Sequence, residues 1–480
     1  MQQKYYLEGG KASHKLSSLI DDVSSVKLNY SVLKDFLWFS TLDPEMTFYE
    51  GVYRLPYGYE LNTNGNPVEV WNPFDIDVDY SMSYQEVIDG VRFYIEKSLK
   101  KLLNQDILAC ELSGGYDSST VYMLARKLGS DPHVLTLAFK DSNADERRYA
   151  DAVLRKWPSD KVHRIDADKI DYADRYNMRW NYKLNPHWPI WITFSMLGPF
   201  FDIAKANGIR RILTGQMGDH LFLGTKDGLW SWLHMGHPLR FAKELSYLPH
   251  PLRFCLSGAK KRLKSYLKPT IEDSKALFVS TLRYSTLLEK EMIPKPTFAE
   301  LHTDHTFCCA DKKQMLLWLT NSSFHMSRYS SFGRALYEQE GIEHVSPFED
   351  RELIEFMLSI PPQYRYGKGN PRYLHAQVMK DLLPTELQQR RKKAEFSISV
   401  WQQMATIDHD RLWEKPVLVE MELLQKETIR RFQQAYKAKK FSNREFQMYW
   451  RMINIEYWYA LNPYLDKSEF PPNPYVLEST

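Results

Sequence analysis

The stretch Ser113-Gly114-Gly115-Tyr116-Asp117-Ser118-Ser119 combines residue types that suit phosphate chemistry. Its glycines allow the backbone to approach an anion closely, and its serines add hydroxyl donors. The carboxylate of Asp117 suits a magnesium ion that bridges phosphates. The stretch lacks the GxxxxGK[ST] pattern of the common kinases and GTPases. We therefore expect a phosphate-binding loop of another class; the alternative is a turn that is rich in Gly and Ser for structural reasons alone.

The flanking sequence predicts the elements that would position this loop. Residues 107–112 form a mainly apolar run that suits a buried strand, and apolar residues recur at helical spacing from Val121 to Leu128. Gly129 stands where that helix would end. A strand, a small-residue turn and a helix start present free backbone N–H groups to an anion, together with the positive end of the helix.

Strand and helix patterns alternate around this loop. Further strands are predicted at 134–139, 161–166 and 211–213, and helices at 84–104, from 145 onward and at 194–207. This alternation predicts the α/β class, with a parallel sheet covered by helices on both faces. Ligands of such sheets bind at the carboxyl ends of the strands.

A second small-residue turn follows the strand predicted at 211–213. It contains Gly215, Gln216 and Asp219, and it should open into the same crevice as the first loop. Asp117 and Asp219 could then hold Mg²⁺ on bound phosphates, although Asp219 could equally cap a helix.

The 480 residues are enough for two domains, or for one large domain with an appendage. We predict short strands and turns in residues 1–80, with a helix over Tyr30–Phe39 and packing on the segment that follows. Residues 81–225 should form the α/β core. Residues 226–480 show no strand pattern and should be mainly helical.

Composition limits the class of partner and the compartment. The net charge of +3 gives no overall basic field for nucleic acid, and the basic run at 260–264 is typical of a solvated helix face. The four cysteines form no CxxC pair, which favours a reducing compartment. No signal peptide and no apolar run of membrane-spanning length is found. We expect a cytoplasmic protein without a nucleic-acid or membrane partner.

SGGxDSS resembles the pyrophosphate-binding loop of the ATP pyrophosphatases, which split ATP into AMP and pyrophosphate. Three further motifs select the asparagine synthetase family among them: the turn at 214–219, "G-h-E-x-x-x-P-F-x-D-x-x-L" at 341–353, and the Leu-Pro, Arg, Lys and Phe pattern at 383–396. Residues 47–58 resemble the stretch that closes the glutaminase half of these enzymes. Position 2, where the glutaminase nucleophile would be a cysteine, is Gln2, so we expect no glutamine hydrolysis by this chain.

The resemblance implies ATP and Mg²⁺ as cofactors and assigns roles by motif. Asp117 and Asp219 would be the magnesium carboxylates, and Lys393, next to the easily confused Lys392, would stabilise charge in the transition states. Glu343 stands where β-lactam synthetases have a glutamate of their catalytic dyad; a structural salt bridge is the alternative. The nucleotide would contact the loop and the second turn, namely Leu112, Ser113, Gly114, Gly115, Asp117, Ser118, Ser119 and Gly215.

Two departures point away from ordinary asparagine synthesis. Asparagine synthetases have a glutamate near the incoming ammonia where this chain has Gln216, which cannot take a proton. Asp219-His220 replaces the usual Asp-Glu, a variant that resembles some lasso-peptide cyclases. We therefore expect a ligase that adenylates a small-molecule or peptide carboxylate and passes it to an amine, giving an amide or a macrolactam. A lasso-type cyclase would imply a leader-removing protease and a precursor peptide as partners.

Three other functions remain open at this stage. The chain could make asparagine from free ammonia or with a separate glutaminase. It could be a tRNA-modifying pyrophosphatase, against which the balanced charge and the missing thiol pattern argue. It could be an inactive scaffold, against which Asp117, Asp219 and Lys393 argue.

Overall fold

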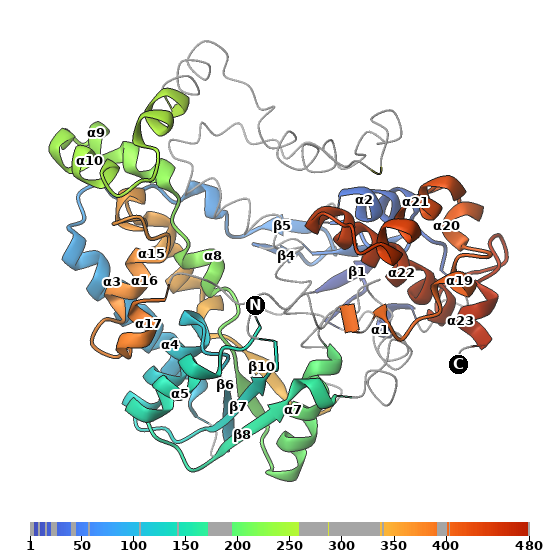
Figure 1. The fold of residues 1–480 in the computed structure, drawn as a ribbon, viewed down its shortest axis with the longest axis horizontal. Helices are drawn as coiled ribbons and strands as arrows, with labels where there is room; N and C mark the ends of the chain where they lie inside the picture. Colours follow the sequence, from blue (N-terminus) through green and yellow to red (C-terminus); the bar gives the residue numbers. More distant parts are fainter. Residues whose placement is uncertain are drawn as a thin grey trace.

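The computed structural model describes residues 4–7, 10–14, 17–20, 26–39, 45–55, 58–104, 107–141, 144–170, 194–258, 287, 337, 340–390, 401–402 and 404–478. A five-stranded sheet organises one half of the molecule, in the order β10-β9-β6-β7-β8 (Figure 1). Its strands are β6 (Leu108–Glu111), β7 (His133–Ala138), β8 (Val162–Asp166), β9 (Arg211–Leu213) and β10 (Glu343–Val345). All neighbouring pairs are parallel, so the predicted α/β class is confirmed.

The order of the strands places a crevice beside β6. The chain proceeds from β6 to β7 and β8 on one side and then returns to β9 and β10 on the other, so the direction of the connections changes between β6 and β9. Loops that leave two such strands diverge to opposite faces of the sheet, and this opens a binding crevice at their carboxyl ends. Both predicted functional turns leave the sheet here.

Helices cover both faces of this sheet. On one face, Cys110, Val134 and Leu213 join a core that includes side chains of α3, α4 and α15. On the other face, Ala109, Leu135 and Ile212 belong to a second core, which includes side chains of α7. The covering helices are α3 (Tyr84–Leu102), α4 (Tyr116–Lys127), α5 (Arg147–Lys156), α7 (Phe194–Ala206), α15 (Arg351–Ser359), α16 (Tyr373–Val378) and α17 (Thr385–Gln388).

The prediction that no strand follows residue 225 is wrong at β10. This strand has three residues, and His344 and Val345 pair with Ile212 and Leu213 of β9. So short a strand carries no readable period of two, and its pairing depends on a partner more than 100 residues away in the chain. The segments after it, α15 to α17, pack onto the α/β core rather than forming a separate helical part.

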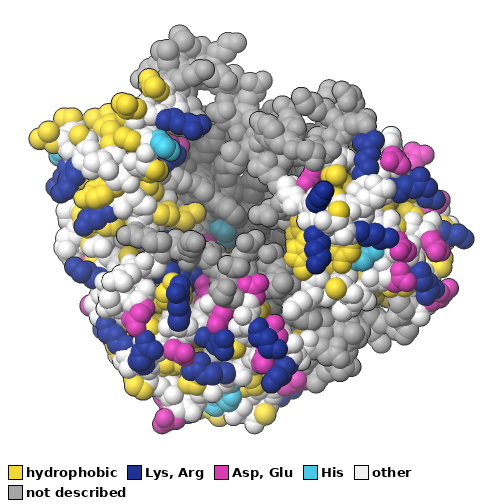
Figure 2. All heavy atoms as spheres, in the orientation of Figure 1, with side chains coloured by type: hydrophobic (Ala, Val, Ile, Leu, Met, Phe, Trp, Pro, Cys, Tyr) yellow, Lys and Arg dark blue, Asp and Glu magenta, His cyan; other side chains and the backbone are white. Residues whose placement is uncertain are grey.

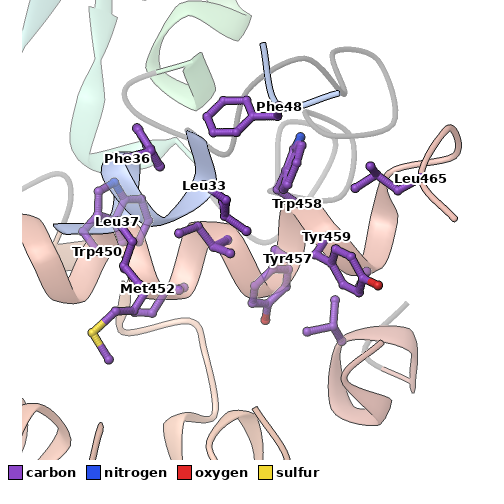
Figure 3. Close-up of a cluster of buried hydrophobic side chains, with 14 of the residues drawn as sticks. Leu33, Phe36, Leu37, Phe48, Trp450, Met452, Tyr457, Trp458, Tyr459 and Leu465 are labelled. Carbon is purple, nitrogen blue, oxygen red and sulfur yellow. The ribbon is translucent and has the colours of Figure 1, made fainter. Parts of the chain in front are cut away.

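The N-terminal segment packs against the C-terminal helices. Leu33, Phe36 and Leu37 of α2 (Tyr30–Phe39) lie in one cluster with Trp450 and Trp458 of α22 (Asn443–Leu461) (Figure 3). We had expected this segment to pack on the residues that follow it. Apolar faces pair according to shape and area rather than sequence order, and α22 supplies the largest apolar face available. The boundaries at 80 and 225 stay a prediction.

The remaining elements are short. The N-terminal strands form two small antiparallel sheets, β2-β1-β3 and β4-β5. Among the described helices, none is both long and apolar enough to cross a membrane. These elements are β1 (Tyr5–Leu7), β2 (Ala12–Ser13), β3 (Val52–Arg54), β4 (Tyr59–Leu61), β5 (Pro67–Glu69), α1 (Ser17–Ile20), α8 (Gly218–Phe222), α9 (Ser231–His234), α10 (Pro238–Leu245), α19 (His409–Leu412), α20 (Val417–Glu420), α21 (Lys426–Lys437) and α23 (Pro474–Glu478), with 3-10 turns at Pro73–Asp75, Ala167–Lys169, Lys226–Trp230, Pro347–Glu349 and Pro362–Tyr364.

Candidate nucleotide-binding site

The loop between β6 and α4 requires glycine at its centre. Gly114 has φ +87°, and a Cβ there would lie 2.7 Å from the carbonyl oxygen of Glu146. Gly115 is the N-cap of α4 and gives the helix no side-chain cap. The first turn of α4 therefore has N–H groups that an anion can take, as the strand–turn–helix pattern predicts.

The serines of the loop divide into two kinds. Ser113 and Ser118 lie together, with their Oγ atoms 3.0 Å apart, and the Gly115 N–H donates to Ser113 Oγ over 3.2 Å. Ser119 is completely buried, so its hydroxyl does not face the crevice as predicted. Leu112 is also completely buried, and its side chain belongs to the hydrophobic core. Only the backbone of these last two residues is placed to assist a ligand.

The two predicted metal carboxylates are brought together by an arginine. Arg372 Nη1 and Nη2 donate to the two carboxylate oxygens of Asp117 over 2.7 Å and 3.1 Å, and Nη2 also pairs with Asp219. One cation thus lies between two carboxylates that come from different strand ends. This arrangement fits a divalent ion that shares carboxylates and phosphate oxygens, the usual setting of protein-bound Mg²⁺. No group of three or more possible metal ligands occurs within the described residues, which suits an ion held largely by phosphate.

A buried histidine supports this carboxylate pair. His375 Nδ1 lies 3.4 Å from Asp117 Oδ1, and its Nε2 lies 2.8 Å from Thr120 Oγ1. Burial, and then the charge of Arg372, lower the pKa of His375 well below its ordinary value. His375 is therefore neutral and positions Asp117 without adding charge.

The second turn packs directly against the first loop. A Cβ at Gly215 would lie 2.4 Å from the backbone nitrogen of Ser118, and one at Gly218 would lie 2.3 Å from Asp117 Cγ. Met217 between them has φ +71°, a left-handed conformation that is uncommon for a residue with a side chain. Gly215 was predicted to contact nucleotide; its observed contact is with the loop that carries Asp117. Such strain in the backbone is typical of functional sites.

Glu111 is a polar residue of this edge that sequence reasoning missed. It ends β6 and accepts hydrogen bonds from Thr214 Oγ1 (2.8 Å) and Tyr337 OH (3.4 Å), while His344 Nε2 lies 2.9 Å from its Oε1. Burial opposes its charge, but attraction to His344 and these bonds hold the pKa of Glu111 below its ordinary value. The ionised carboxylate ties the ends of β6, β9 and β10 together. An acidic residue at the end of an apolar run was the available signal.

Arg390 brings the C-terminal motif to the loop. Its Nη1 donates to the carbonyl of Gly114 over 2.8 Å, its Nη2 pairs with Glu146, and its guanidinium lies 4.9 Å from the centre of the Tyr149 ring. Lys392 and Lys393 lie outside the described residues. Arg372 and Arg390 are distant from the loop in sequence, and no local pattern indicates either of them.

The structure places Glu343 away from this site. It begins β10, at the amino edge of the sheet, and accepts from Arg211 Nε over 2.6 Å. The carboxyl edge, where the loop lies, is at the opposite end of the strands. The predicted catalytic role of Glu343 is therefore not supported, and the salt-bridge alternative describes what is observed.

Gln216 lies at the carboxyl edge as predicted. Its backbone carbonyl accepts from Ser346 Oγ over 2.7 Å, which links the turn after β9 to the end of β10. The candidate site thus unites Ser113, Asp117, Ser118, Gly215, Gln216 and Asp219.

The fold and this edge define a nucleotide-binding α/β protein with a pyrophosphate-type loop. The sequence profile of the family described as asparagine synthase matches residues 90–460, which is most of the chain. The chain belongs to this family, whose members are ATP-dependent ligases. A comparison with curated proteins finds no match.

Proposed function

We propose that this chain adenylates a substrate carboxylate with ATP and transfers the acyl group to an amine, forming an amide. The observation that carries the proposal is the meeting of Asp117 and Asp219 around one cation beside an uncapped helix start. That arrangement gives the pyrophosphate of ATP a donor-rich loop and gives Mg²⁺ two carboxylates.

In the first step, the substrate carboxylate attacks the α-phosphorus of ATP and pyrophosphate leaves. The N–H groups of the first turn of α4, with Ser113 and Ser118, bind the leaving pyrophosphate, and Arg390 holds the loop through Gly114. Bound Mg²⁺ would neutralise phosphate charge at Asp117 and Asp219. Lys393 is proposed, by motif alone, to stabilise the charge that develops on the phosphate.

In the second step, the amine attacks the acyl carbon of the adenylate, AMP leaves, and the amine gives up a proton. The side chain of Gln216 cannot take that proton, so it can only orient the nucleophile. If both groups belong to one substrate, the product is a ring, and holding the two ends together supplies much of the rate. We propose such a small-molecule or peptide substrate, with a leader-removing protease and a precursor peptide as the partners in the peptide case.

The chain is proposed not to make its own ammonia. Its first cysteine is Cys110, which is completely buried in β6, and burial raises the pKa of this thiol well above its ordinary value. A buried, protonated thiol is not a nucleophile. Asparagine formation from free ammonia is the second candidate, and the family description favours it.

The test is ATP–pyrophosphate exchange with Mg²⁺ across aspartate, other small carboxylates and peptides. Exchange with a specialised acid or a peptide would support the proposal, and exchange with aspartate alone would support asparagine formation. Asp117→Asn should abolish exchange, whereas Asp381→Asn, a change at an exposed carboxylate outside the site, should not. Absence of exchange with every acid in the panel would contradict the adenylation proposal.

A further inference from the structure

An exposed apolar surface lies on the helices that follow the second turn. Leu239 on α10 is 86% exposed, and Leu252 and Leu256 in the helix at 251–258 are 79% and 73% exposed. Leu233 and Tyr247 extend the surface. We call these five residues the leucine face; Figure 2 shows hydrophobic side chains spread over this corner of the molecule, where Figure 1 places α9 and α10.

The leucine face is not a core face that happens to be open. The same helices already bury another side, on which Phe241, Leu248 and Phe254 join the core around Trp230 and Trp232. Leu252 and Leu256 are four residues apart and therefore neighbours on the outer side of their helix. Apolar patches of this kind, next to a satisfied core, mark interaction surfaces.

The charge around the leucine face is almost entirely positive. Residues 231–264 contain seven Lys or Arg and one acidic residue, Glu244, in a chain whose net charge is only +3. Arg240, Lys243 and Arg253 are exposed on the described helices. Glu244 accepts from the backbone N–H of Lys368 over 2.8 Å, so its charge is directed to another segment.

We propose that the leucine face docks on an anionic lipid surface. Exposed leucines on paired short helices, with Lys and Arg beside them, have the composition of segments that lie in a membrane interface. Each basic residue near an anionic leaflet adds attraction, and the leucines add burial among the acyl chains. A second copy of this chain is disfavoured, because a two-fold contact would bring the same basic residues face to face. This proposal departs from the expectation of no membrane partner and is independent of the proposed reaction.

The test is flotation of the full chain with vesicles. Binding is expected to vesicles of phosphatidylglycerol with phosphatidylcholine, to be weaker with phosphatidylcholine alone, and to fall as salt is raised. Leu239→Asp with Leu252→Asp should weaken binding by about tenfold or more. Val70→Asp with Phe93→Asp is the matched control: both residues are more than half exposed, at 51% and 58%, and lie outside the leucine face.

Each result decides the proposal. Unchanged thermal unfolding of both double variants would show that folding is not the cause of any loss. No flotation of the unaltered chain with anionic vesicles would overturn the proposal and leave a protein partner as the occupant. Equal flotation of the leucine variant would assign the binding to another surface. A dimer seen by light scattering without lipid, and split by the leucine variant, would make the face a contact between copies.

Discussion

The two edges of the central sheet hold similar ion pairs that do different work. At the amino edge, Arg211 binds Glu343, whose side chain is 58% exposed. At the carboxyl edge, Arg372 joins Asp117 and Asp219 beside a loop with an uncapped helix start. Arg211 is also satisfied by the carbonyl of Leu102, so its pair with Glu343 serves only the sheet. The strand direction, rather than the residue types, separates the structural pair from the functional one.

The largest expected effect is that of Asp117→Asn. Loss of one metal carboxylate should reduce ATP–pyrophosphate exchange by about 100-fold or more, because phosphate charge is then less well neutralised. Calorimetry of ATP binding with and without Mg²⁺ should show that the Mg²⁺-dependent part is lost. Strong Mg²⁺-dependent binding in this variant would break the comparison, because the carboxyl edge would then be no more functional than the amino edge.

Arg372→Met should destabilise the protein and make it dependent on Mg²⁺. Removing the guanidinium leaves two carboxylates facing each other in a partly buried site, which costs on the order of 3 kcal/mol. The melting temperature should fall, and Mg²⁺ should raise it more in the variant than in the unaltered chain. Arg92→Met, which removes a similar arginine from α3, is the control; an equal response to Mg²⁺ in both variants would contradict the assignment of the metal site.

Glu111→Gln should weaken the carboxyl edge and change its response to acid. The hydrogen bonds to this carboxylate predict a loss of about 1–3 kcal/mol at neutral pH. Because the pKa of Glu111 is lowered on folding, its charge stabilises the protein above the unfolded pKa, and this is lost as pH falls through the folded value. Urea unfolding at neutral and acidic pH should show a difference between variant and unaltered chain that shrinks in acid; a constant difference would mean that charge is not involved.

The smallest effect is expected for Glu343→Gln. An exposed pair contributes about 1 kcal/mol or less, and the amino edge has no role in the proposed reaction. Exchange should stay within about twofold of the unaltered rate, with a minor change in stability. Loss of exchange with intact folding would restore a catalytic role to Glu343 and make the two edges functionally connected.

Prediction from sequence succeeded where the signal was local. The helix at Tyr30–Phe39, the strand at 211–213 and the strand–loop–helix around Gly114 follow from short periodic patterns and small-residue turns. Prediction failed at β10 and at the packing of the first 80 residues, because both depend on partners far away in the chain. Ser119 was misplaced for a related reason: a motif gives the residue, and only the turn of the helix decides which side is buried.

The sequence by itself determined the class of chemistry. Two glycines, adjacent serines and an aspartate between a strand and a helix are sufficient for a phosphate loop, because these constraints act over a few residues. The tertiary structure alone decided that Arg372 lies between Asp117 and Asp219, and that Glu343 lies at the other edge. Those facts depend on strand order and direction, which are set by burial across the whole sheet and are not written in any one segment.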